Sequence, residues 1–87
     1  MGKIKNILVV GAGTMGSGIA QVFASNNYKT VMADLKQEFL DTAWKRIDGN
    51  IDGMLEEGLC DESYRERVKA NLSTILNEEI PSVAGQF

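Results

Sequence analysis

Three glycines and one aspartate are the residues of this sequence whose types and spacing could do chemistry. Gly11, Gly13 and Gly16 form a G-x-G-x-x-G pattern that directly follows an apolar run. Asp34 comes eighteen residues after Gly16, at the end of a second strand-like run at 29–34. A glycine pattern alone is common, but strand, glycine turn, helix, strand and acid together are typical of a βαβ unit that binds a dinucleotide.

Each glycine is predicted to have a separate role. Gly11 allows the tight turn out of the strand, Gly13 lets the backbone approach a pyrophosphate, and Gly16 lets the helix pack closely on the sheet. A helix that begins near Thr14 would direct its free N–H groups and the positive end of its dipole at the phosphates. The predicted cofactor-binding residues are therefore Gly11, Ala12, Gly13, Thr14, Met15, Gly16 and Asp34.

The carboxylate of Asp34 determines which dinucleotide we expect. It would accept hydrogen bonds from the adenosine ribose hydroxyls and would repel a 2′-phosphate, so the sequence favours NAD over NADP. Lys36 is a nearby cation that could tolerate a phosphate, which weakens this preference. The alternative interpretation is an ordinary tight turn between strand and helix, with Asp34 merely a polar residue at the strand end.

Residues that could catalyse a reaction are missing from the pattern. The chain has no histidine, the usual group for moving a hydroxyl proton during hydride transfer. Cys60 is the single cysteine, and without a histidine we interpret it as a bystander thiol that fits a reducing cytoplasm. We predict no catalytic residue and no metal site, so the chain is equipped to hold a cofactor and not to use it.

Alternating strands and helices are expected to position these residues. The first helix carries Met15, Ile19, Val22 and Phe23 at helical spacing, with Ala20 and Ala24 beside them for close approach to the sheet. The predicted elements are a strand at 4–10, a helix at 14–26, a strand at 29–34, helices at 37–57 and 62–71, and a strand at 72–76.

The helix at 37–57 is longer than a crossover between neighbouring strands requires. Gly49 and Gly53 lie inside its apolar pattern and would permit a kink or a close contact. Gly58 is well placed as its C-terminal cap, and we assign Trp44 and Met54 to core packing rather than to a ligand. Asp61 is predicted to cap the following helix.

Composition excludes several classes of partner. The 87 residues carry a net charge of −3, and their Lys and Arg residues are spread along the chain, which argues against nucleic acid. The sequence has no apolar run of the length that spans a membrane. We therefore expect one small cytoplasmic domain whose partner is a small molecule.

The stretch Gly-Ala-Gly-Thr-Met-Gly-Ser-Gly-Ile-Ala-Gln-Val-Phe-Ala at 11–24 closely resembles the start of 3-hydroxyacyl-CoA dehydrogenases, especially the bacterial 3-hydroxybutyryl-CoA dehydrogenases. The resemblance covers roughly residues 4–76. It implies that Gly11 to Gly16 bind the NAD pyrophosphate and that Asp34 binds the adenosine ribose. It also implies that the long helices form an arm beside the acyl-CoA. The reaction of the family is the reversible oxidation of 3-hydroxyacyl-CoA to 3-oxoacyl-CoA in fatty acid and butyrate metabolism.

The resemblance stops at about residue 77, where the sequence departs from the family's fourth strand. The family's later catalytic His and its Glu have no counterpart here. We therefore expect an α/β fold, a partial Rossmann fold with a parallel sheet of about three strands in the order 3-2-1 and a long amphipathic helix pair after the second strand. Residues 1–76 would be a truncated N-terminal NAD-binding domain and 77–87 an irregular tail, with the catalytic half and the C-terminal helical domain absent. The chain alone should be inactive, and acyl-CoA would be a partner only of the full-length parent.

Half of a sheet would leave the first strand at an edge. An unpaired edge invites pairing with another chain, so we expect a homodimer through this strand or through domain swapping of the helix at 37–57. Two alternatives stay open: a non-enzymatic nucleotide-binding module that works with a partner chain, and an interaction protein whose glycine loop is unused.

Overall fold

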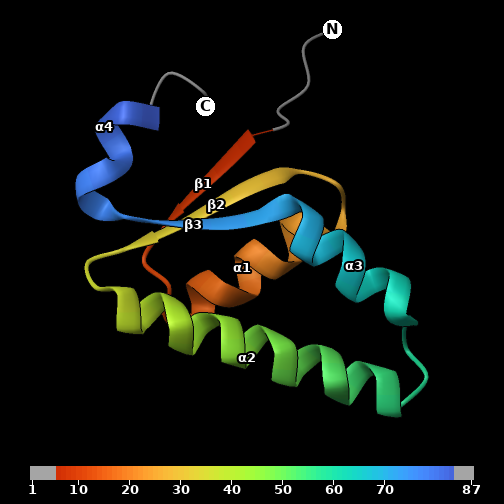
Figure 1. Cartoon of the computed structure of the whole chain (residues 1–87). Coiled ribbons are helices and arrows are strands. Elements are labelled where there is room, and N and C mark those ends of the chain that lie inside the picture. Colours follow the sequence, from red (N-terminus) through yellow and green to blue (C-terminus); the bar gives the residue numbers. More distant parts are fainter. Residues whose placement is uncertain (1–5, 84–87) are drawn as a thin grey trace, which may run out of the picture.

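The structure, a computed structural model, describes residues 6–83 and alternates strands with helices (Figure 1). Every predicted element is present, and within residues 6–83 its ends differ from the prediction by one residue or none. In chain order the elements are β1 (Asn6–Val10), α1 (Thr14–Ser25), β2 (Lys29–Asp34), α2 (Gln37–Glu56), α3 (Glu62–Asn71), β3 (Leu72–Leu76), the 3₁₀ turn η1 (Asn77–Glu79) and α4 (Ile80–Val83). Residues 4 and 5, which we assigned to the first strand, lie outside the described range.

The three strands form a parallel sheet in the order β1-β2-β3, as predicted. β2 is central, with Thr30 opposite Ile7 of β1 on one side and opposite Leu72 of β3 on the other. Helices α1, α2 and α3 all lie on one face of the sheet (Figure 1). This follows from the topology, because two right-handed crossovers that advance in the same direction place their helices on the same face.

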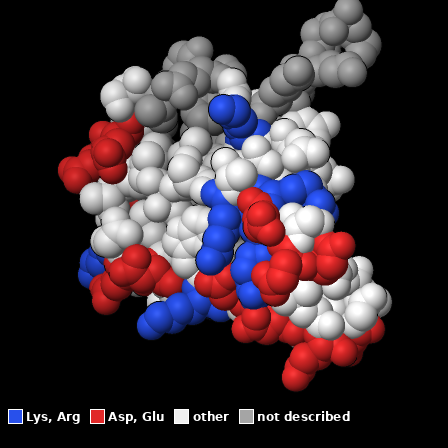
Figure 2. All heavy atoms as spheres, turned by 45° about the vertical axis from the view of Figure 1, so that its right-hand side comes forward, with Lys and Arg blue, Asp and Glu red and all other residues white. Residues whose placement is uncertain are grey.

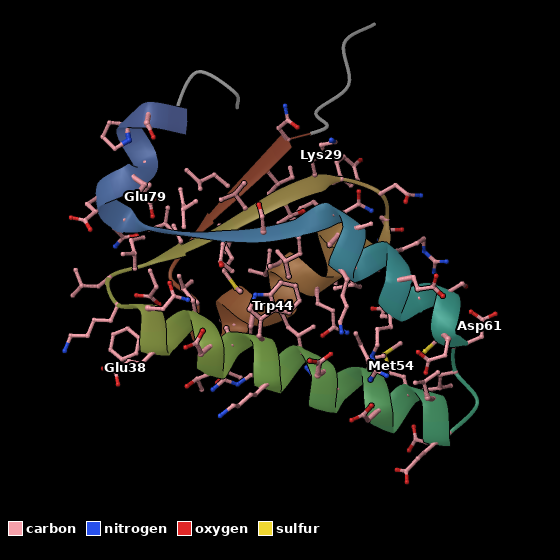
Figure 3. The ribbon with its side chains drawn as sticks, viewed as in Figure 1. Lys29, Glu38, Trp44, Met54, Asp61 and Glu79 are labelled. Carbon is pink, nitrogen blue, oxygen red and sulfur yellow. The ribbon has the colours of Figure 1, made fainter. Side chains whose placement is uncertain are left out.

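The core lies between this face of the sheet and helix α2. Leu40, Ile47 and Ile51 recur at helical spacing along α2 and are buried against Met32 of β2 and Val68 of α3. Trp44 points from α2 toward the sheet and packs against this cluster (Figure 3). Its predicted structural role is therefore confirmed.

The ends of the helices use the residues that the sequence indicates. Asn27, after α1, and Gly58, after α2, have positive φ angles of 67° and 72°, the left-handed geometry that terminates a helix. At the start of α3, the Asp61 carboxylate accepts a hydrogen bond from the Ser63 backbone N–H at 3.0 Å. The caps predicted at Gly58 and Asp61 are confirmed.

The prediction for the packing face of α1 was right for Ala20 and Ala24 but wrong for the large apolar residues. The buried side chains of α1 are Ser17, Ala20, Gln21 and Ala24, whereas Met15, Ile19 and Val22 are 79%, 43% and 57% exposed. Small residues let α1 approach the sheet, and Gln21 Nε2 donates to the Tyr64 hydroxyl of α3 at 3.1 Å. The apolar spacing identified the helix, but its large apolar residues do not mark the face that packs against the sheet.

Two further expectations need correction. Apart from the backbone of α2 itself, no described atom lies within 4 Å of a Cβ placed at Gly49 or Gly53. Neither glycine is therefore needed for a close contact with another element. Residues 77–83 are not irregular but form η1 and α4. The reason is local, because the Glu79 carboxylate accepts a hydrogen bond from the Leu76 backbone N–H at 2.8 Å and closes the first turn.

Candidate dinucleotide site

The glycine loop joins the end of β1 to the start of α1. Gly11 has a φ of 94°, in the left-handed region that favours glycine, and its N–H donates to the Ala33 carbonyl at 2.7 Å. The loop is therefore turned sharply and fastened to the neighbouring strand β2.

Gly16 allows helix α1 to start directly against this loop. A Cβ at Gly16 would lie 1.9 Å from the Gly11 carbonyl oxygen and 3.6 Å from Cγ1 of Val9. No side chain fits there without moving the backbone. Gly16 thus has the close-packing role predicted for it, although its nearest neighbour is the loop backbone and not the sheet.

Gly13, unlike Gly16, is surrounded by open space. It is the N-cap of α1 with a φ of −70°, which any residue can adopt, and a Cβ there would meet nothing within 4 Å. The fold itself does not require glycine at this position. The open space above Gly13 leaves room for a group that approaches the backbone closely, as a pyrophosphate does.

The start of α1 presents free amides beside this space. Helical hydrogen bonding begins with the Ser17 N–H, which donates to the Gly13 carbonyl at 2.8 Å. In the described part of the chain, the N–H groups of Thr14, Met15 and Gly16 have no backbone acceptor. No acidic side chain lies in the first turn of α1, so its positive end is not neutralised there.

Asp34 reaches the glycine loop from the end of β2. One of its carboxylate oxygens accepts the Ala12 backbone N–H at 2.7 Å, and the other accepts the Leu35 N–H at 2.6 Å. The structure therefore brings the predicted acid and the predicted loop together. Each oxygen keeps a second lone pair that a ligand hydroxyl could use.

A small pocket of about 150 Å³ lies between the loop, Asp34 and helix α2. Three of the residues that line this pocket, Ala12, Gly13 and Asp34, were predicted from the sequence, and three on α2 were not. The missed residues follow Asp34 at helical spacing, so an i, i+3, i+7 search of the next helix could have found them. They are Phe39, Thr42 and Arg46. Of the predicted residues, Met15 places its side chain elsewhere, in a separate groove of about 400 Å³ on α1 with Ile19 and Val22.

The resolved pKa shifts lie away from this site, at α3 and the end of α2. Hydrogen bonds from the side chain and backbone of Ser63 hold the pKa of Asp61 below its usual value. Arg65 binds Asp52 and lies 3.6 Å from an Asp48 carboxylate oxygen, and the Asp52 bond raises the pKa of its guanidinium. Figure 2 shows acidic and basic side chains interspersed on this face.

Two kinds of feature are absent from residues 6–83. These residues hold no cluster of three or more His, Cys, Asp or Glu side chains that could bind a metal ion. None of the helices described there is both long and apolar enough to cross a membrane.

A parallel sheet, a glycine turn at a helix N-terminus and an acid at the end of the second strand define a Rossmann-type dinucleotide-binding domain. Comparison with known families identifies which one. Residues 6–82 match the family model described as "3-hydroxyacyl-CoA dehydrogenase, NAD binding domain". The chain belongs to this family, whose cofactor is NAD, and the predicted resemblance is confirmed.

Individual relatives agree with the family. A protein of Deinococcus radiodurans named "Probable 3-hydroxybutyryl-CoA dehydrogenase" is 46% identical over 50 residues, which cover 58% of this chain and 18% of that protein. A peroxisomal fatty acid beta-oxidation multifunctional protein of Arabidopsis thaliana is 29% identical over 77 residues, 88% of this chain and 11% of that protein.

Among solved structures, the (S)-3-hydroxybutyryl-CoA dehydrogenase of Ralstonia eutropha superposes with a TM-score of 0.82 at 25% identity. The match covers 86% of this chain and 26% of that one. The chain thus spans less than a fifth of the length of these curated relatives and about a quarter of this structure.

Proposed function

We propose that this chain binds NAD through the loop at 11–16 and through Asp34. The free amides of Thr14, Met15 and Gly16 would hold the pyrophosphate, with Gly13 giving it room to approach and Gly11 setting the turn. Ala12 contributes through its backbone position, because its N–H already binds Asp34. The open space at Gly13 is the observation that carries this proposal, since the fold alone gives no reason for a glycine there.

Asp34 would bind the adenosine ribose and select NAD over NADP. Both of its oxygens accept backbone N–H groups, so the carboxylate is held beside the loop and cannot easily turn away from a 2′-phosphate. Lys36 is exposed and would lessen this repulsion only in part. We therefore expect weaker binding of NADP than of NAD, and expect an Asp34→Asn variant to reduce the difference.

The reaction we propose for the whole protein is hydride transfer between NAD and the C3 position of a 3-hydroxyacyl-CoA. Relatives named as 3-hydroxybutyryl-CoA dehydrogenases point to a short acyl chain. The present 87 residues contain no histidine, and we propose that they do not reduce acetoacetyl-CoA by themselves. Oxidation of NADH by the chain alone in the presence of acetoacetyl-CoA, above the rate without protein, would refute this.

Titration calorimetry with NAD tests the binding proposal with one variant in the loop and one control variant on α2. Gly13→Ser keeps a residue that is favourable at an N-cap but fills the space meant for the pyrophosphate. We expect it to weaken NAD binding about tenfold or more, equivalent to about 1.4 kcal/mol. Gly49→Ala adds one Cβ to α2, away from the loop, and should leave the affinity unchanged. Equal affinities for wild type and Gly13→Ser would contradict the proposal.

A second candidate function is a nucleotide-binding module that works with a protein partner. It is favoured by the exposed apolar side chains on α1, namely Met15, Ile19 and Val22. Such a module would distinguish NADH from NAD when it regulates a partner. Equal affinities for the two redox forms would argue against it.

We also propose that the chain forms a homodimer through the edge of β1. Within residues 6–83, β1 pairs with β2 alone, and a strand at the edge of a sheet favours pairing with another chain. Exchange of α2 has less support, because α2 packs on α1, β2 and α3 of its own chain. Light scattering after size-exclusion chromatography measures the mass, and a monomer at tens of micromolar would contradict self-association.

A cytoplasmic location is proposed on the single free Cys60, which fits a reducing compartment. The Arabidopsis relative is named as peroxisomal, so the two compartments are the outcomes to distinguish. Fractionation of cells that produce the whole protein would decide between them.

A further inference from the structure

Two of the three arginines in this protein are engaged by their neighbours, and one is not. Arg65 forms ion pairs with carboxylates of α2 and α3. Arg67 donates to the Ser25 carbonyl at 3.2 Å and lies over the Tyr64 ring. Arg46 is partly buried, yet within residues 6–83 it makes no hydrogen bond or ion pair. Its planar donor group therefore remains available for a ligand.

The position of Arg46 indicates which ligand group it would meet. Arg46, Thr42 and Phe39 lie on one face of α2 and form one wall of the pocket of about 150 Å³, whose other residues include Asp34 and Gly13. Whole ligands of drug size occupy about 300–1,000 Å³, so this pocket fits one part of a dinucleotide. Since Asp34 borders it, that part is the one next to the adenosine ribose.

The chemistry of the wall suits a flat aromatic ring. Phe39 is 43% exposed. The Thr42 hydroxyl donates to the Glu38 carbonyl at 2.9 Å, so its hydrogen is already used. A guanidinium is planar and stacks on aromatic rings. Adenine is a neutral ring, whereas the nicotinamide ring of NAD⁺ is cationic and would be repelled by Arg46. The wall therefore selects for the adenine end of the cofactor.

We propose that Arg46 stacks on the adenine ring of the bound nucleotide, with Phe39 packing against the ring from the first turns of α2. Arg46 is then a specificity-determining residue for the purine. This inference rests on the proposed binding of NAD at the glycine loop. With this contact, the proposed site includes helix α2 as well as the glycine loop and Asp34.

Nucleotide titrations followed by NMR test the role of Arg46 in the full chain. The probes are AMP and CMP, which share a phosphate and a ribose and differ in the base. We expect the wild type to prefer AMP, and Arg46→Met to weaken AMP binding about tenfold with little effect on CMP, because the stacking contact to the purine is lost. Arg46→Lys should lose most of this preference too, since it keeps the charge without the plane.

The control variant is Lys45→Met, which removes the neighbouring exposed cation of α2 that does not line the pocket. It should bind AMP as the wild type does. An intermolecular NOE between the adenine protons and the Arg46 or Phe39 side chain is the direct readout. All variants should melt at the temperature of the wild type, because neither Arg46 nor Lys45 makes a hydrogen bond or ion pair within residues 6–83.

Three outcomes would overturn the inference. If Arg46→Met weakens AMP and CMP equally while Arg46→Lys binds normally, Arg46 is a phosphate contact. If AMP binding depends on Gly13 but not on Arg46, the proposed function stands and the adenine contact does not. If neither NAD nor AMP binds to the wild type, the proposed function and this inference both fail.

Discussion

The glycines of the loop at 11–16 and the glycines of helix α2 lie in opposite surroundings. Gly16 is pressed against the Gly11 carbonyl, whereas Gly49 and Gly53 have no neighbouring atom in the way of a Cβ. Gly13 is in the loop by sequence, but its surroundings are as open as those in α2. The fold therefore requires glycine at position 16, whereas only a bound ligand would require it at position 13. Substitutions with small residues can test this difference directly.

The largest effect is expected from Gly16→Ala. Its Cβ would lie 1.9 Å from the Gly11 carbonyl oxygen, which is backbone and cannot rotate away. We expect a loss of about 3 kcal/mol of unfolding free energy, the upper part of the range for overpacking. Urea unfolding followed by circular dichroism measures it. An unfolding curve that coincides with that of the wild type would show that the loop is not held as described.

Asp34→Ala should have the next largest effect on the fold, because it removes the acceptor of two backbone N–H groups. We expect a loss of about 2 kcal/mol of stability, since hydrogen bonds to charged groups contribute about 1.5–3 kcal/mol each and exposed ones less. Hydrogen exchange provides a local check. The Ala12 amide should be protected in the wild type and should exchange rapidly in the variant.

Gly49→Ala and Gly53→Ala should each stabilise the chain. Alanine is favoured over glycine in a helix interior by up to about 1 kcal/mol, and neither site has a clash to offset the gain. Thermal unfolding measures the increase, and the NAD affinity should not change. Destabilisation by either variant would mean that α2 contacts something at that position outside the described residues.

The smallest effect is expected at the cap of α3, and it depends on pH. The pKa of Asp61 is held below 3.8 in the folded chain by hydrogen bonds from Ser63. The charged cap therefore stabilises the fold above this pH, and its contribution is lost as the pH falls through the folded pKa. Asp61→Ala should lower the melting temperature at pH 7, and the difference from wild type should shrink in acid. A difference independent of pH would contradict this role.

The sequence predicted the strands, the helices and their order, because the buried runs, the caps and the glycine turn are local signals. It also placed Asp34 beside the loop, since the ends of neighbouring parallel strands lie at the same edge of a sheet. It failed for the orientation of α1. Met15, Ile19 and Val22 have the spacing of a core face, but small residues and the bond from Gln21 to Tyr64 decide the packing.

The contribution of α2 to the site was also missed, for a physical reason. Arg46 follows Asp34 by twelve residues, and both side chains line the same pocket only because α2 packs beside the end of β2. In that packing, Leu40 and Ile47 of α2 are buried in the core cluster that also contains Met32 of β2. No short sequence motif encodes this packing of α2, so the sequence does not distinguish Arg46 from any other charged residue on a helix.

The most direct test of the central claim is the affinity of NAD for wild type and for Gly13→Ser, measured by calorimetry on proteins of equal thermal stability. The account predicts that the wild type binds NAD and that the variant binds at least about tenfold more weakly, a difference of about 1.4 kcal/mol. Equal affinities, or no binding by the wild type at millimolar NAD, would show that the open space above Gly13 is not where the pyrophosphate lies.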